Sequence, residues 1–202
     1  RTKVTKAPGT TDESPATENT HEGFIPAHGG YEQLLSFQKA RIVYDGTVRF
    51  CNRFVDPRSR THDQMVQAAR SGKQNILEGS QASGTSKESE IKLTNVARAS
   101  LEELLEDYRD YLRVRDLEEW SRDHPHTLRM RELNRQSGAD YSTFRKGIEH
   151  PDPAIAANVM IGLIKLTNYL LDQQLRRLEQ HLQQVQIHEE ILPELFLGPQ
   201  PP

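Results

Sequence analysis

The chain has 202 residues, of which 26 are Lys or Arg and 29 are Asp or Glu, so its formal net charge at pH 7 is -3. This balance provides no overall attraction to nucleic acid, and such binding needs a local basic patch or one assembled by oligomerisation. Only 35% of the residues are hydrophobic, so we expect part of the chain to lie outside any core. No apolar run approaches the roughly 20 residues that span a bilayer.

The N-terminal stretch Arg1–Gly29 is rich in Thr, Pro, Glu and Gly, and we expect a disordered tail or linker. It has no apolar segment typical of a signal peptide, so a trimmed fragment is favoured over a secreted precursor. Cys51 is the only cysteine, which excludes an intrachain disulfide and suits a reducing, cytoplasmic compartment. Because Cys51 falls on the apolar face of a predicted helix, we expect it in the core.

Two helices are predicted first. Apolar residues at alternating three- and four-residue steps indicate a helix over residues 31–54, and Asp56-Pro57 closes it because the residue before a proline avoids helical dihedrals. The run Thr61–Gln64 is typical of a capping box that opens a second helix over residues 62–78, and Gly79 supplies a left-handed stop. The short connection predicts antiparallel neighbours.

The second helix carries an unusually small apolar face, and a close approach of a neighbouring helix is expected there. Its members recur at helical spacing: Met65, Ala68, Ala69, Gly72 and Ile76. A polar stripe of Ser71, Asn75 and Glu78 lies beside it. We interpret the stripe as a network that fixes helix register or as an oligomer contact, because a single carboxylate without a partner acid, base or nucleophile argues weakly for catalysis.

A third helix is predicted over residues 87–114, with a capping box at Thr85–Glu88 and a continuous apolar stripe. Residues 115–153 form a long insertion of the kind that is often functional or mobile. Leu117 and Trp120 are expected to anchor one short helix within it. A second short helix, which begins near Pro125, is expected to use Leu128, Met130 and Leu133, and residues 136–153 are expected to form a loop.

A fourth helix is predicted over residues 154–188, because Asp152-Pro153 has N-cap and first-turn chemistry. Its apolar seam continues to the far end, where we expect an interaction surface of Leu175, Leu178, Leu182 and Val185. This helix is too long for the others to cover. A neighbouring subunit or the insertion around Leu117 and Trp120 is favoured as the cover, and a partner protein is the alternative. Residues 189–202 form a Pro-rich tail.

These elements predict an all-α fold, an antiparallel up-down-up-down four-helix bundle over residues 30–188 with an insertion between its third and fourth helices and flexible termini. No catalytic residue, cofactor or metal is expected, because the sequence contains no phosphate-binding loop, no nucleophile elbow and no histidines at metal-ligand spacing. Six cations are predicted to form a nucleic-acid-binding surface. They are Arg49, Arg53, Arg58, Arg60, Arg70 and Lys73. The alternative is an ordinary solvated face paired with the acidic third helix.

Several runs resemble the four-helix-bundle family encoded in 23S rRNA intervening sequences, and in particular its four helix bundle suffix domain branch. The runs are Gln67–Ser71, Asn75–Gly79, Val96–Leu104, His28–Tyr31, Ser36–Lys39, Ser59–Met65 and Asn168–Gln174. The similarity extends roughly over residues 28–184.

This resemblance implies an up-down-up-down bundle, a cyclic homo-oligomer often described as a pentamer, and no established enzymatic activity. A related branch is the accessory protein of diversity-generating retroelements, which associates with a reverse transcriptase and binds nucleic acid through a basic surface. We therefore expect a non-enzymatic oligomeric scaffold that assists a nucleic-acid-processing partner. The alternative is a protein-interaction module without nucleic-acid binding.

Overall fold

The computed structural model describes residues 30–136 and 138–196, so the predicted tail at residues 1–29 and the last part of the Pro-rich tail lie outside the described residues. Helix is the only regular secondary structure in these two ranges, which confirms the all-α prediction. In chain order the elements are η1 (Gly30–Gln33), α1 (Leu35–Phe54), α2 (Arg60–Ala82), α3 (Lys87–Arg113), α4 (Pro125–Asn134), α5 (Tyr141–Ile148) and α6 (Pro153–Phe196).

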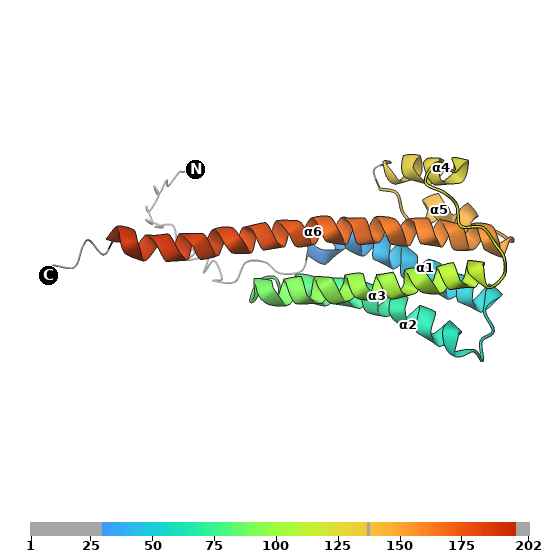
Figure 1. The fold of residues 1–202 in the computed structure, drawn as a ribbon, viewed down its shortest axis with the longest axis horizontal. Helices are drawn as coiled ribbons and strands as arrows, with labels where there is room; N and C mark the ends of the chain where they lie inside the picture. Colours follow the sequence, from blue (N-terminus) through green and yellow to red (C-terminus); the bar gives the residue numbers. More distant parts are fainter. Residues whose placement is uncertain (1–29, 137, 197–202) are drawn as a thin grey trace, which may run out of the picture.

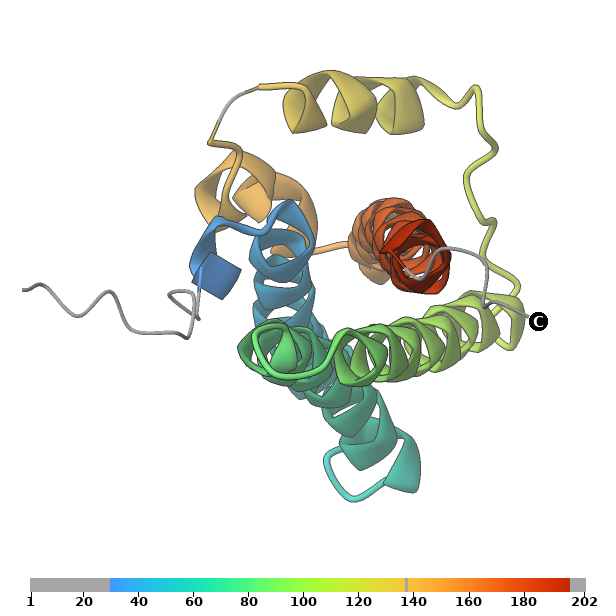
Figure 2. The same ribbon diagram turned by 90° about the vertical axis from the view of Figure 1, so that its left-hand side faces the viewer.

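The core lies between α1, α2, α3 and α6. Helix α2 packs against α1 and α3, and α6 packs against the same two helices, as Figures 1 and 2 show. The Phe50 ring lies 4.9 Å from the Tyr108 ring, and the Tyr108 hydroxyl donates a hydrogen bond of 3.2 Å to Thr47 Oγ1. Cys51 is fully buried with its Sγ 3.9 Å from Met65 Sδ. Burial of these apolar groups supplies most of the drive to fold.

Two glycines of α2 allow α3 to come close. A Cβ placed on Gly72 would lie 2.7 Å from Leu101 Cγ, which confirms the predicted close approach at the small face. Gly79 was predicted to stop the helix, and this prediction is wrong. Helix α2 runs on to Ala82, and Gly79 is buried where a Cβ would lie 3.4 Å from the Glu90 carbonyl oxygen. Gly79 therefore serves helix packing instead of a turn.

The helix ends follow local capping chemistry, with small corrections. The expected end at Asp56-Pro57 holds, since α1 ends at Phe54. The second helix begins earlier than predicted because Ser59 is its N-cap and accepts a hydrogen bond from the His62 N–H at 3.2 Å. Ser86, and not Thr85, caps α3. The Asp152 side chain accepts from the Ala154 N–H at 2.8 Å, as expected for the start of α6.

The insertion contains two helices, of which the sequence predicts one. Helix α4 matches the expected segment near Pro125. The predicted short helix around Leu117 and Trp120 is wrong, because that segment is not helical. The predicted loop at residues 136–153 is also wrong, since it contains α5, which Asp140 and Thr143 open with reciprocal hydrogen bonds. Helix α5 packs on α1 and α6 through buried Phe144 and Ile148.

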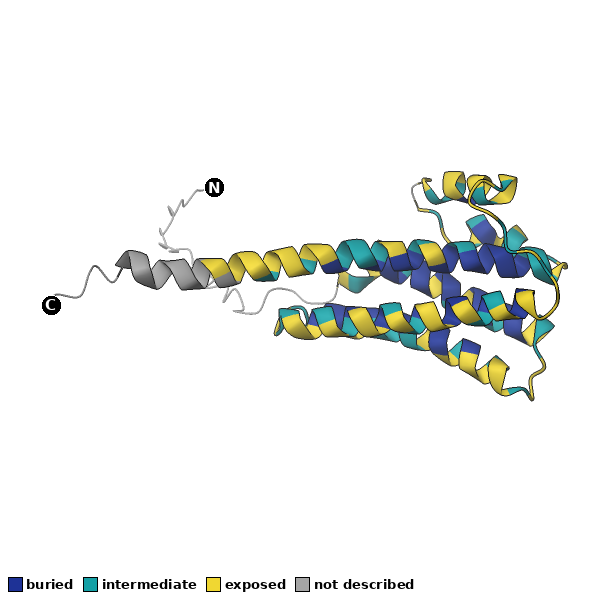
Figure 3. Ribbon diagram, in the orientation of Figure 1, coloured by how far each residue is buried: buried dark blue, intermediate teal, exposed yellow. Residues whose placement is uncertain are grey.

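Helix α6 is the longest element at 44 residues, and it runs to Phe196, beyond the expected end at residue 188. Figure 3 shows its burial decreasing along its length as it extends beyond the other helices. The stretch Pro153–Val185 is long and apolar enough to cross a membrane by length and composition, so the expectation that no apolar run approaches that length is wrong. However, 61% of its most apolar window is buried inside the protein, as expected for a core helix.

Candidate functional site

The predicted interaction seam on α6 changes character along the helix. Leu171 and Leu175 are buried, with exposed fractions of 0% and 7%. Leu178 and Leu182 are half-buried, and Val185 has an exposed fraction of 40%. All five share one face, since they follow one another at alternating four- and three-residue steps. An apolar stripe that begins in the core therefore continues onto a surface, at the end of the helix that extends beyond its neighbours (Figure 3).

The insertion was one expected cover for this stripe, and the structure excludes it. The Trp120 N–H donates to Asn158 Oδ1 at 2.7 Å, and the Asn158 amide donates to the Glu118 carbonyl at 2.9 Å. Asn158 lies in the second turn of α6. The segment around Trp120 is thus fixed at the opposite end of α6 from Val185.

An ion-pair network holds the same segment in place. The Glu119 carboxylate accepts from Lys165 Nζ of α6 at 2.6 Å and from Arg109 Nε of α3 at 3.2 Å. Partial burial opposes ionisation of Glu119, but these two cations outweigh it and hold its pKa below the usual value. The loop between α3 and α4 is therefore tied to two core helices.

Two of the three members of the predicted polar stripe of α2, Ser71 and Asn75, are joined by hydrogen bonds. The hydroxyls of Ser71 and Ser100 are 2.9 Å apart, which joins α2 to α3. The Asn75 amide donates to the Ser71 carbonyl at 2.9 Å and to its hydroxyl at 3.2 Å. Glu78 is exposed and takes no part in these bonds. This geometry fits a contact that fixes the register of two helices better than a catalytic site.

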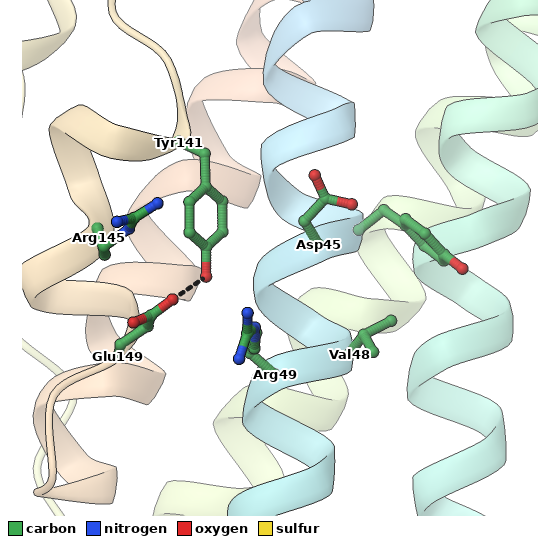
Figure 4. A pocket seen from close by; sticks show the side chains of 7 residues that line it. Asp45, Val48, Arg49, Tyr141, Arg145 and Glu149 are labelled. Atoms are coloured by element: carbon green, nitrogen blue, oxygen red, sulfur yellow. Dashed lines mark hydrogen bonds between the residues drawn. The ribbon is translucent and has the colours of Figure 1, made fainter.

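Two of the six predicted cations line separate grooves. Arg49 lies between α1 and α5 in a groove of about 670 Å³ with Asp45, Arg145 and Glu149 (Figure 4). Burial and a 3.0 Å hydrogen bond from Tyr141 to Glu149 raise the pKa of this tyrosine to about 12.

The other groove contains Arg60. It lies between α2 and α3, and its lining includes Asp63 and Glu103. In both grooves the positive charges are balanced or outnumbered by carboxylates, so neither provides a strongly basic site.

The other four predicted cations do not line these two grooves. Arg53 stacks on Phe54 with its guanidinium carbon 4.6 Å from the ring centre, and Lys73 Nζ lies 4.4 Å from the ring centre of Tyr44. Arg58 and Arg70 are exposed. Within the part of the chain that the structure describes, no salt bridge involves any of the six. The nucleic-acid surface stays a prediction, spread over at least two faces.

A more strongly basic surface lies in the insertion, and it contains none of the six predicted cations. A cleft between α4 and α6 is lined by four cations, and these are Arg122, Arg131, Arg135 and Lys165. Its α4 wall consists of Thr127, Met130, Arg131 and Asn134. Their spacing of three, four and seven residues marks one helix face, and this was the available signal.

The described residues contain no group of three or more His, Cys, Asp or Glu placed to hold a metal ion. What the geometry provides is a set of surfaces: the exposed stripe of α6, the scattered cations of α1 and α2, and the basic cleft of α4 and α6. No family model, no curated protein and no solved structure matches the chain, so these surfaces carry the argument for function.

Proposed function

We propose that the protein is a non-enzymatic scaffold that self-associates, built as an antiparallel up-down-up-down four-helix bundle of α1, α2, α3 and α6. The bundle is supported by the contacts of α2 and α6 with both α1 and α3, and by the alternating directions of the four helices in Figure 1. Closed symmetry is the usual arrangement of such oligomers. The family resemblance implies five subunits arranged in a ring.

The observation that carries this proposal is the loss of burial along one continuous stripe of α6. Leu175 belongs to the core, whereas Val185 on the same face is exposed. Covering the part of Leu182 and Val185 that is still exposed would contribute up to about 1 kcal/mol for each side chain.

A second copy of the chain fits this surface. Between residues 178 and 185 the only charged side chain is Glu179, and the other polar positions carry Gln or His. The same face on two copies can therefore pair without strong like-charge repulsion.

Light scattering on the full chain tests the proposal. The parent should have the mass of an oligomer at micromolar concentration, and Leu182→Glu combined with Val185→Glu should convert it to a monomer. The matched control is Gln180→Glu with Gln184→Glu, which adds the same charges at exposed positions off the stripe and should leave the oligomer intact. A monomeric parent would overturn the proposal.

Truncation after Arg176 provides an independent measurement. The shortened chain should remain helical and cooperatively folded while its mass falls to that of a monomer. If it unfolds outright, the removed segment belongs to the core of the single subunit and the association surface lies elsewhere.

Nucleic-acid contact is the second candidate function, as an accessory to a nucleic-acid-processing partner such as a reverse transcriptase. It is favoured by six cations that form no salt bridge with residues 30–136 or 138–196, and a ring would repeat these cations around its axis. Reversing Arg70 and Lys73 to Glu should weaken retention on nucleic acid and flatten its salt dependence. Absence of retention by the parent at low salt would instead favour a protein-interaction module.

A further inference from the structure

The cleft between α4 and α6 has the size and construction of a ligand site. It encloses about 780 Å³, within the roughly 300–1,000 Å³ usual for small-molecule sites. One wall is a single face of α4 and the other is a single face of α6, where Gly162 admits Met130: a Cβ on this glycine would lie 2.8 Å from Met130 Cε. The loop that carries Trp120 closes one side and is held by the Asn158 hydrogen bonds.

The charge of this cleft is one-sided, unlike that of the two other grooves. Its lining contains Arg122, Arg131, Arg135 and Lys165 and no Asp or Glu. Lys165 is already paired with Glu119. The three arginines take part in none of the salt bridges formed among the described residues. In a chain of net charge -3, three free guanidinium groups around one cavity select for an anion, and their forked donors match phosphate.

The same cleft exposes flat aromatic surface. Tyr169 is 58% exposed on the α6 wall, and Trp120, which also lines the cleft, is half-buried and packs against the core. His124 stacks on the indole at 4.8 Å, and His126 lies 4.9 Å from it. The two imidazoles are 5.3 Å apart, so the three rings form one aromatic cluster around Trp120.

A polar group on the α4 wall also lacks a partner. Asn134 Oδ1 is buried and forms no hydrogen bond among the described residues, and Asn134 lines the cleft. Leaving a buried acceptor unpaired is costly. A ligand amino group would satisfy it once the Asn134 side chain turned toward the cleft, and purine and pyrimidine rings carry such groups.

We propose that this cleft binds a nucleotide, with its phosphate on Arg131 and Arg135 and its base against Trp120 and Tyr169. The combination of an aromatic ring with a phosphate is shared by a free nucleotide and by one unit of a single-stranded nucleic acid. This inference does not depend on self-association, because the cleft lies entirely within one subunit.

Trp120 is the only tryptophan of the chain, so its fluorescence reports on the cleft without labelling. AMP should change this fluorescence saturably, whereas adenosine and inorganic phosphate should each bind about tenfold or more weakly, since each offers half of the contacts. A short oligoadenylate distinguishes the two sources. Binding no tighter than that of AMP indicates a free nucleotide, and binding at least about tenfold tighter indicates a single strand whose neighbouring phosphates reach the other cations.

Variants of the full chain then place the binding in the cleft. Arg131→Gln with Arg135→Gln should weaken AMP binding about tenfold or more. The control is Arg113→Gln with Arg129→Gln, which removes two cations paired with acids on their own helices and should bind as the parent does. Tyr169→Ala alters one exposed ring and should weaken binding about tenfold, so the test survives if the arginine pair fails to fold. Unchanged Trp120 fluorescence with both AMP and the oligonucleotide would overturn the proposal, as would equal losses in the two arginine pairs.

Discussion

The two ends of α6 share one apolar period but differ in their surroundings. Around Leu163 and Ile164 the helix is buried on several sides, whereas at Val185 the same period faces outward. The reason is the length of the neighbours: α6 has 44 residues, and α3, the next longest helix, has 27. At 1.5 Å per residue these lengths are about 66 and 40 Å. Burial along a helix is thus set by the reach of its neighbours as much as by its own sequence.

The largest expected effect comes from truncating a leucine to alanine in the buried part of α6, compared with the same truncation in its distal part. Leu163→Ala leaves a cavity at a site with no exposure and should lower the free energy of unfolding by about 2–5 kcal/mol. Leu182→Ala should cost less than about 1 kcal/mol in the isolated subunit. Denaturant unfolding at one low protein concentration measures both, because association makes stability depend on concentration. Equal losses would mean that the distal stripe is already covered within one chain.

Overpacking the core tests how little space the buried region has. Gly72→Leu would drive a side chain into Leu101, which already lies 2.7 Å from the position of a Cβ. The expected loss is about 1–3 kcal/mol, seen as a lower melting temperature. Gln81→Leu, at an exposed position of the same helix, is the control and should change stability little. An unchanged melting temperature for Gly72→Leu would show that α2 and α3 separate easily.

The smallest expected effect is a pH-dependent change in stability that comes from a partly buried carboxyl of α3. Partial burial, with Glu103 and Asp110 nearby, raises the pKa of Asp107 on α3 from 3.8 to about 6. Because the folded state binds this proton more tightly, the contribution of Asp107 to stability is present at low pH. It falls as the pH rises from about 4 to about 6 and is lost above that.

Asp107→Asn removes the free-energy cost of holding this partly buried carboxyl in its ionised form. It should raise the free energy of unfolding at pH 7 by about 1 kcal/mol, a value reduced for the partial exposure of the carboxyl, and should change it little at pH 4. Asp123→Asn, at an exposed carboxyl outside α3, is the control. Equal effects of Asp107→Asn at the two pH values would show that this group is fully solvated.

The sequence was sufficient for the long helices because each carries a sustained apolar period and clear end signals. Asp56-Pro57 and Asp152-Pro153 act within one turn, so their effect can be predicted without knowledge of the rest of the fold. Helix α5 was missed because its eight residues are too few for a periodic signal and Pro151 and Pro153 follow closely. The pairing of Asp140 with Thr143 was the signal that remained.

What the sequence could not provide depends on contacts between distant segments. A glycine such as Gly79 can end a helix or admit a neighbour, and only the position of Glu90 on α3 decides between these roles. The basic cleft also depends on contacts between distant segments. Arg131 and Lys165 belong to separate helices, and their proximity depends on how the Trp120 loop returns α4 to α6.

The buried cysteine has a practical consequence. Burial, with a smaller contribution from Asp107, raises the pKa of Cys51 to about 12, so almost none of this thiol is in the reactive thiolate form near neutral pH. A thiol reagent can modify the native chain only after α1 and α2 move apart. Since the chain has a single cysteine, the rate of its modification would measure how often the core opens spontaneously in the unmutated protein.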